Sequence, residues 1–306
     1  MLQKNGRLTV RTRKYPFTMQ HAALSVKPFL KWAGGKRQLL PTLTEYAPKQ
    51  FQHYYEPFVG AGALFLALQP RQAVINDLNA ELVNAYRVIQ KQPEELLRQL
   101  QAHSNDPDYF YQIRALDREA HLYEQLDPVQ RASRTIYLNK TCYNGLYRVN
   151  RKGQFNAPFG RYRKPLIADE TGIRNLHRFL NQRPVRILNT DFEQAVQNAR
   201  AGDFVYFDPP YDPLSPSASF TAYQQEGFGR PEQRRLARVV QDLTRRGCRV
   251  MLSNSSTDFI RSLYKGYTQI PVSASRRINA VAANRGLIEE LLVLNYHPET
   301  GKLLTF

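Results

Sequence analysis

Cysteine is scarce in this sequence. Only Cys142 and Cys248 occur among its 306 residues, and neither has a neighbour at metal-ligand spacing. This scarcity argues against a disulfide framework or a zinc site and favours a reducing, cytoplasmic setting. The histidines, among them His53, His177 and His297, are also scattered. We therefore expect no bound metal and assign these histidines structural or surface roles.

Long apolar runs are missing as well. The longest, near residues 63–68, is interrupted at Gln69 and Pro70, far short of the roughly 20 residues that a membrane helix needs. The basic N-terminus is not followed by an apolar core or a small-residue cleavage site, which argues against a signal peptide. We expect no membrane partner.

Acidic residues are absent from two long stretches. Residues 1–44 contain nine Lys or Arg and no Asp or Glu, and residues 131–164 repeat that pattern within a chain of formal net charge +17. A surface that is merely hydrated normally mixes positive and negative charges. Stretches of positive charge alone therefore favour a surface that binds the phosphates of a nucleic acid, here called a phosphate footprint. Solubility alone is the alternative, and charge by itself does not exclude it. Neither stretch is a strong basic amphipathic helix, which disfavours a membrane surface.

Apolar patterning predicts alternating short strands and helices. Strands are expected before Gly60 and at residues 73–77, 185–188, 204–207, 249–252 and 289–296. Helices are expected at residues 63–68, around 82–89 and 96–100, from 128 onward, and at 231–246, where Pro starts and Gly247 follows the helix. Such alternation predicts the α/β class.

The middle of the chain differs from its flanks. Residues 26–80 and 165–306 carry the strand–helix alternation, whereas residues 81–164 predict an inserted, mostly helical and basic domain that ends in a β-hairpin near residues 151–153. Residues 1–25 show little apolar periodicity and are expected to form a flexible basic tail.

A glycine turn, Gly60-Ala61-Gly62, lies between an expected strand and an expected helix. Glycines at such a place let the backbone approach a cofactor at the carboxyl edge of a sheet. Asp77, at the end of the next strand, is placed to accept hydrogen bonds from ribose hydroxyls. The alternative is a turn in which Asp77 caps the following helix, and the residues alone leave both open.

The segment Asp208-Pro209-Pro210-Tyr211 follows a strongly apolar strand, where open α/β sheets bind ligands. Two prolines hold the chain extended and remove two backbone donors, so carbonyls are left to accept. An acid, a carbonyl and an aromatic ring suit a base with an amino group, because two oxygens accept its N–H bonds and the ring stacks on it. An ordinary Asp-Pro turn is the less specific alternative.

Two further segments are basic, aromatic and rich in glycine. Residues 31–36 could form a lid over a cofactor or a plain loop, and composition does not decide. Residues 143–148 and 155–162 contain Arg, Asn and aromatic side chains, of the kinds that read guanine, read adenine and wedge between bases. A folded hairpin with a hydrated basic face is the alternative.

Together and in this order, these segments resemble the Dam family of DNA adenine-N6 methyltransferases over about residues 27–296. The motifs are FLKWAGGK at 29–36, EPFVGAG at 56–62, YNGLYR at 143–148, FNAPFGRY at 155–162 and DPPY at 208–211. Residues 214–215 and 220–223 also resemble family sequence. The resemblance implies a Rossmann-like S-adenosylmethionine-dependent sheet at 26–80 and 165–306 as the catalytic domain, with 81–164 as the target-recognition domain.

The resemblance also implies roles for single residues. The S-adenosyl-L-methionine site would contain Trp32, Lys36, Phe58, Gly60, Gly62, Asp77, Asp191, Phe192 and Asp208. Catalysis would involve Asp208, Pro209, Pro210 and Tyr211. DNA contacts would come from Lys31, Tyr143, Asn144, Leu146, Arg148, Asn150, Pro158, Arg161 and Tyr162. The implied target is 5′-GATC-3′ in double-stranded DNA, the implied product is S-adenosyl-L-homocysteine, and the implied enzyme is a cytoplasmic, nucleoid-associated monomer on DNA.

The chemistry of such a reaction follows from its acceptor. N6 of adenine lies inside the duplex, so the base must be flipped out. Its lone pair is delocalised, and hydrogen bonds to Asp208 and to the Pro209 carbonyl would localise and aim it, while Tyr211 stacks on the ring. Asp208 is not expected to remove a proton beforehand, because the amino group is far too weak an acid.

Three other interpretations fit part of the sequence. The acid, carbonyl and ring of the DPPY segment would also suit N4 of cytosine, or adenine in RNA. By resemblance, Asp rather than Ser before the two prolines favours adenine. A DNA-binding module with a degenerate pocket would leave the intact Asp208, Tyr211 and Asp77 unexplained. A nicotinamide dehydrogenase shares the glycine turn but explains neither the DPPY segment nor the basic insert.

Overall fold

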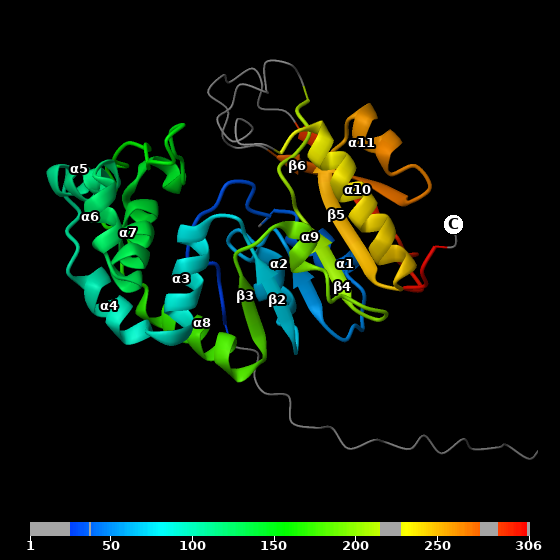
Figure 1. The fold of residues 1–306 in the computed structure, drawn as a ribbon, viewed down its shortest axis with the longest axis horizontal. Coiled ribbons are helices and arrows are strands. Elements are labelled where there is room, and N and C mark those ends of the chain that lie inside the picture. Colours follow the sequence, from blue (N-terminus) through cyan, green and yellow to red (C-terminus); the bar gives the residue numbers. More distant parts are fainter. Residues whose placement is uncertain (1–24, 37, 215–227, 276–286, 305–306) are drawn as a thin grey trace, which may run out of the picture.

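The computed structural model describes residues 25–36, 38–214, 228–275 and 287–304. Its centre is a seven-stranded sheet in the order β3-β2-β1-β4-β5-β7-β6 (Figure 1). The first five strands of the chain run parallel, and β7 is antiparallel to both β5 and β6. The strands are β1 (Tyr54–Glu56), β2 (Ala73–Asn76), β3 (Val185–Leu188), β4 (Phe204–Phe207), β5 (Arg249–Ser255), β6 (Thr268–Ser275) and β7 (Leu287–Leu294).

Both faces of the sheet are buried, because apolar residues occupy successive strand positions that point to opposite sides. Tyr54 and Tyr206 belong to the core on one face, and Tyr55 and Phe207 to the core on the other. The first core contains α1 (Leu40–Tyr46), α2 (Ala63–Leu68), α3 (Ala80–Lys91) and α8 (Glu170–Gln182). The second contains α9 (Phe192–Ala195), α10 (Arg230–Arg245) and α11 (Asp258–Leu263).

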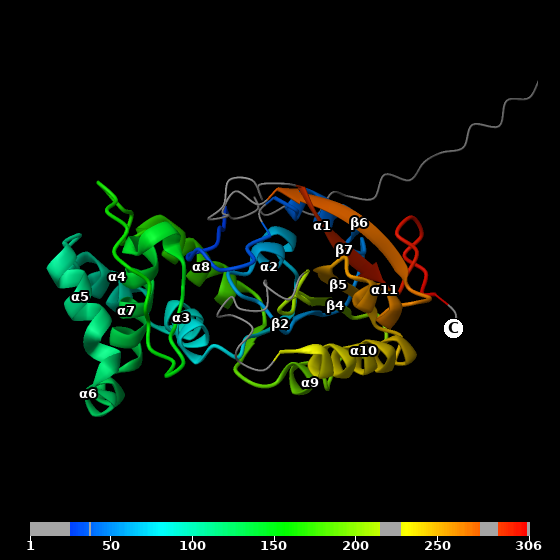
Figure 2. The ribbon, with the colours of Figure 1, turned by 90° about the horizontal axis from the view of Figure 1, so that it is seen from above.

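A group of helices lies beside the β3 edge of the sheet in both views (Figures 1 and 2). It consists of α4 (Pro93–Gln101), α5 (Pro107–Ala115), α6 (Ala120–Gln125) and α7 (Pro128–Thr141). Helix α7 starts with a capping box between Asp127 and Gln130, which satisfies two backbone N–H groups. Helices α3 and α8 contact this group and connect it to the sheet.

A third apolar cluster joins this helical group to the segment that follows α7. Phe110 and Tyr137 pack there against Phe155 and Ala157. The segment turns at Gly153, whose φ of +74° suits glycine, and Val149 and Phe155 form an isolated bridge across the turn. The expected hairpin is therefore a turn with isolated bridges rather than a pair of regular strands.

The α/β class and most strands agree with the sequence-based expectation. Strands β3 and β4 have the predicted bounds, whereas β5 continues to Ser255, three residues further than predicted. Strand β6 was not predicted, because Pro271 interrupts its pattern. It is one of the two edge strands of the sheet and therefore tolerates a residue without an N–H donor. The tail up to residue 24 and the family-like residues 220–223 lie outside the described residues.

Within the described part of the chain, no helix combines the length and the apolarity that spanning a bilayer requires.

Candidate active site and DNA-binding surface

Four sequence-predicted segments meet at the carboxyl edge of the parallel strands. Asp191 follows β3, Asp77 follows β2, the glycine turn follows β1 and Asp208 follows β4. These strands are consecutive neighbours in the sheet, and the chain order reverses between β1 and β4. Open α/β sheets bind ligands at such a switch point, so the predicted catalytic and cofactor segments share one edge.

The glycine turn has the geometry that only glycine adopts without strain. Gly60 and Gly62 have φ values of +49° and +71°. A Cβ atom on Gly62 would lie 2.8 Å from the Tyr86 hydroxyl, and one on Gly60 would lie 3.0 Å from the Trp32 ring. The turn therefore needs glycine both for its backbone conformation and for the close approach of two aromatic side chains.

Asp77 holds this turn rather than capping the next helix. Its Oδ2 accepts a hydrogen bond from the Gly60 N–H at 3.0 Å, and its Oδ1 accepts one from the Asn79 N–H. The N-cap of α3 is Asn79, whose side chain accepts from the Leu82 N–H. Burial raises the pKa of Asp77, while the two backbone N–H groups oppose this shift by stabilising the carboxylate.

Asp208 forms the centre of a charged cluster. Its Oδ1 lies 2.8 Å from Nζ of Lys36, which also donates to the Gly34 carbonyl and lies 4.6 Å from the centre of the Tyr211 ring. Burial raises the pKa of Asp208, and the Lys36 ammonium opposes this shift. Residues 31–36 thus supply the counter-ion of Asp208, so Lys36 belongs to this site rather than to a phosphate footprint.

Two further acids lie near this cluster, the half-buried Glu290 and the buried Glu56. The Tyr211 hydroxyl donates to Glu290 at 2.7 Å, which fixes the far end of its ring. Glu56, the acid of the EPFVGAG motif, accepts from the Tyr54 hydroxyl at 2.7 Å, and burial raises the pKa of Glu56 to about 8. Below that pH the buried Glu56 carboxyl is protonated, which limits the negative charge near Asp208.

A pair of buried amides that the sequence did not reveal holds the DPPY segment. Gln233 of α10 donates to the Pro210 carbonyl at 2.8 Å and accepts from Asn254 of β5 at 3.0 Å. Asn254 in turn accepts from the Asp212 N–H at 3.1 Å. The peptide groups on both sides of Tyr211 are therefore fixed, and with them the φ and ψ of Tyr211. These two residues carry no local sequence signal, because Gln233 is one of many polar residues of α10 and Asn254 lies between two serines of β5.

The predicted cofactor-binding residues Asp191 and Phe192 lie at the β3 end of the edge. Phe192 is buried and stacks on Phe58 with ring centroids 5.5 Å apart. Both oxygens of Asp191 accept hydrogen bonds from the Arg235 guanidinium, at 2.8 and 2.6 Å. These hydrogen bonds lower the pKa of Asp191. The structure thus brings Phe58 and Phe192 together and shows Asp191 engaged by Arg235.

The predicted DNA-contacting residues gather around the end of α7. The Tyr143 N–H donates to the Pro158 carbonyl at 2.8 Å, and Lys31 Nζ lies 5.5 Å from the centre of the Tyr162 ring. The side chains that this surface exposes are those of Lys31, Tyr143, Asn144, Leu146, Arg148, Pro158 and Arg161, while Tyr162 and Asn150 are half-buried. Asn144 and Arg161 adopt left-handed φ values of +57° and +52°, a costly conformation outside glycine.

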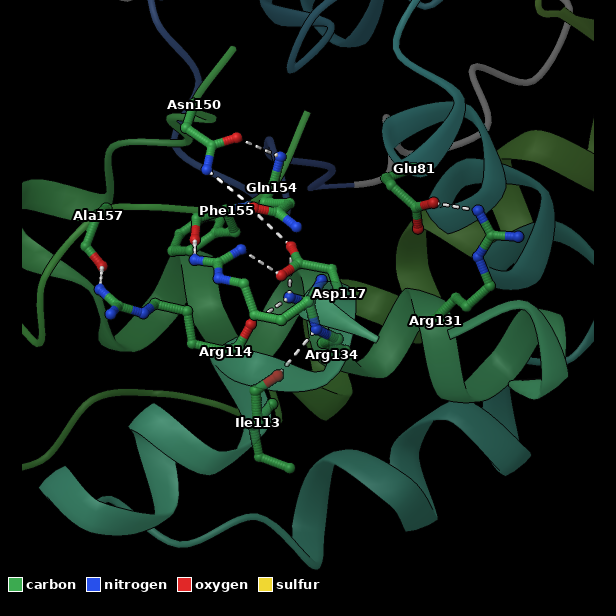
Figure 3. Close-up of polar contacts among 11 residues, drawn as sticks. Glu81, Ile113, Arg114, Asp117, Arg131, Arg134, Asn150, Gln154, Phe155 and Ala157 are labelled. Carbon is green, nitrogen blue, oxygen red and sulfur yellow. Dashed lines mark hydrogen bonds and ion pairs between the residues drawn. The ribbon is translucent and has the colours of Figure 1, made fainter. Parts of the chain in front are cut away.

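Asn150 has a clear local role in the turn. Its Oδ1 accepts from the backbone N–H of Lys152. Its Oδ1 also accepts from the Gln154 backbone N–H, and its Nδ2 donates to the Gln154 side chain (Figure 3). Arg148 donates to the side chain and the carbonyl of Asn156. Both residues therefore shape the hairpin in this structure, and their contacts with DNA stay a prediction.

An arginine cluster fixes the base of the hairpin to the helices (Figure 3). Asp117 accepts from the Phe155 N–H at 2.7 Å and pairs with Arg118 and Arg134. Arg118 donates to the Phe155 carbonyl, and Arg114 donates to the Ala157 carbonyl. The helical group thereby holds the hairpin at several backbone positions.

This cluster corrects the interpretation of residues 131–164 as one phosphate footprint. Arg134 is 5% exposed and pairs with Asp117, and Arg131 pairs with Glu81. These two arginines stabilise the fold. The exposed basic side chains that remain are those of Arg148, Arg151, Lys152, Arg161, Arg163 and Lys164.

The fold and the edge of the sheet define the class of protein. The chain is an α/β methyltransferase of the Rossmann-like, S-adenosylmethionine-dependent kind. The family model of the D12 class N6 adenine-specific DNA methyltransferases matches residues 32–278. The chain belongs to this family, and it is a DNA methyltransferase specific for adenine. This assignment selects adenine N6 over the cytosine and RNA alternatives.

Similar proteins cover nearly the whole chain. A Type II methyltransferase of Lactococcus lactis subsp. cremoris, M1.LlaDCHI, is 44% identical over 91% of this chain and 98% of its own length. The Type II methyltransferase M.MjaIII of Methanocaldococcus jannaschii is 41% identical over 89% of this chain and 100% of its own. The DNA adenine methylase of Escherichia coli K12 is 34% identical over 89% of this chain and 96% of its own.

Proposed function

We propose that this enzyme methylates adenine N6 in 5′-GATC-3′ of double-stranded DNA, after flipping the adenine out of the duplex. The observation that carries this proposal is the position of Asp208 and Tyr211 beside the glycine turn, at the switch point of the sheet. The exposed Tyr143, Asn144 and Leu146 support the target sequence, because they occupy the positions that the resemblance assigns to base contacts.

S-adenosyl-L-methionine, which the family and the fold imply as the methyl donor, suits this edge of the sheet. The positive φ of Gly60 and Gly62 and the absence of Cβ atoms let the Trp32 ring lie directly against the backbone of the turn. Phe58 and Phe192 form an aromatic wall near Asp191. When bound, the cofactor supplies a methyl group on a sulfonium, which reacts with a nucleophile without help from a metal.

The chain's own residues then prepare the acceptor. The carboxylate of Asp208 and the carbonyl of Pro209 accept the two N–H bonds of N6, so that its lone pair is directed away from the ring. Lys36 keeps Asp208 ionised against the cost of burial. Tyr211 stacks on the flipped base, and alignment of the reactants supplies much of the rate. The surplus N6 proton leaves during or after transfer, to the Asp208 carboxylate that accepts its hydrogen bond or to water.

The first experiment measures transfer of labelled methyl groups to two duplexes that differ only in GATC and GTTC. We expect label on the GATC duplex alone. Equal label on both duplexes would contradict the assigned target while leaving the chemistry intact. Label on neither duplex would contradict the proposed substrate as a whole.

Gln233 is expected to act as a positioning residue for Tyr211 in this reaction. In Gln233→Leu the Pro210 carbonyl and the Asn254 amide lose their partner, so the peptide groups around Tyr211 are no longer fixed. A displacement of about 1 Å near the chemistry can cost about 100-fold in rate, so we expect kcat to fall about 10- to 100-fold.

The matched control is Gln241→Leu, at an exposed position on the same helix. Cofactor affinity, measured by calorimetry, and KM for the duplex should stay within about 2-fold of the control. A rise in KM with kcat unchanged would mean that Gln233 supports binding rather than the position of Tyr211.

A further inference from the structure

One buried side chain joins the cofactor segment to the recognition turn. Asn139, on α7, is 1% exposed. Its Oδ1 accepts from the Lys31 N–H at 3.0 Å, and its Nδ2 donates to the Lys31 carbonyl at 2.8 Å. The same Nδ2 donates to the Gly145 carbonyl at 3.0 Å. A single amide thus holds both peptide groups of Lys31 and one of the recognition turn, across 108 positions of sequence.

Packing contacts strengthen this junction. A Cβ atom on Gly145 would lie 2.5 Å from the Lys31 side chain, so the turn rests directly on that side chain. One residue after Lys31 and two residues after Gly145, the rings of Trp32 and Tyr147 stack with centroids 4.7 Å apart and an interplanar angle of 26°. The two segments therefore touch at backbone, aliphatic and aromatic groups.

Each side of the junction leads to a different part of the proposed reaction. From Lys31 the chain continues through Trp32, beside the glycine turn, to Lys36, the counter-ion of Asp208. Gly145 stands between Asn144 and Leu146, which are exposed and assigned to base contacts. The junction therefore gives the turn a direct contact with the segment that supplies the counter-ion of Asp208.

We propose that Asn139 is a positioning residue that couples target recognition by residues 143–148 to the catalytic edge through residues 31–36. The proposal rests on the proposed function, since it requires a preferred target. Because the amide fixes both peptide groups of Lys31, a correctly seated turn sets the position of Trp32 and Lys36, and a poorly seated turn displaces them. Asn139 thereby increases the difference in rate between target and non-target DNA.

The test compares single-turnover methylation of the GATC and GTTC duplexes by the wild-type enzyme and Asn139→Ala. Asn84→Ala serves as the control, because it removes the same type of side chain from an exposed hydrogen bond to the Pro128 carbonyl, outside the junction. We expect the GATC rate of Asn139→Ala to fall about 10-fold more than the GTTC rate, so that the ratio of rates collapses. Cofactor affinity and Tm are measured in parallel.

A second variant approaches the junction from the turn. Gly145→Ala pushes against Lys31 and is expected to lower the same ratio, and the double variant should lose less than the product of the two single losses. This variant decides the question if Asn139→Ala unfolds. Equal losses on both duplexes, or fully multiplicative effects in the double variant, would overturn the coupling. The wild-type ratio separately tests the proposed target, since a ratio of one there contradicts the proposed function itself.

Discussion

Asp208→Ala is expected to lower the rate of methyl transfer at least about 100-fold, the scale of losing one preorganised electrostatic partner of a reacting group. The variant loses the carboxylate that accepts an N6 hydrogen bond, and Lys36 loses its partner at 2.8 Å. Duplex binding should persist, because the exposed recognition surface lies on other segments. Single-turnover transfer to the GATC duplex measures the rate, and a gel-shift titration measures binding.

Asp208→Asn separates two roles for this side chain. The asparagine keeps one acceptor oxygen but cannot take up a proton, so it should retain more activity than the alanine variant if Asp208 only accepts a hydrogen bond. Burial raises the pKa of Asp208, so the wild-type rate should fall as the pH drops through that raised value, and the asparagine variant should lack this acidic limb. Near-normal turnover of Asp208→Ala would contradict the mechanism.

Motifs at the ends of strands were predictable because their chemistry is local. The turn at Gly60 needs glycine at positions of positive φ. The DPPY segment directly follows four buried apolar residues of β4. Each motif is therefore visible in a few consecutive residues. Strands β3 and β4 were equally predictable, since their apolar runs are short and bounded. The residues that support these motifs were not predictable in this way.

Supporting residues become visible only when distant segments meet. Asn139 lies 108 positions from Lys31, and Gln233 lies 23 positions from Pro210. Each is a buried polar side chain on a helix that carries several other polar residues, and the backbone groups it bonds have no sequence signature. Arg134 likewise belongs to the acid-free stretch that was predicted to bind DNA phosphates. Its ion-pair partner, Asp117, precedes that stretch in the sequence, so the pairing that buries Arg134 could not be seen there. Local sequence therefore identifies the reacting groups more readily than their supports.

Asp117→Ala is expected to destabilise the enzyme by about 3 kcal/mol, the lower end of the cost of leaving one partner of a buried ion pair alone. Asp117 accepts from the Phe155 N–H and pairs with Arg134, whose side chain is 6% exposed. The change removes the charged partner of that guanidinium, which keeps only the carbonyls of Ile113 and Arg114, and leaves the Phe155 N–H without its acceptor (Figure 3). Thermal unfolding followed by circular dichroism should show a Tm about 6–12 °C lower.

Glu124→Ala is the matched control, because it also removes one negative charge, from an exposed position on α6. Its Tm should change by less than about 2 °C, as is usual for an exposed substitution. If Asp117→Ala were no less stable than this control, the arginine cluster would not be what holds the hairpin. At temperatures where Asp117→Ala is still folded, it should also discriminate less between the GATC and GTTC duplexes. The reason is that the hairpin, which carries Arg148 and Pro158, would lose its anchor to the helices.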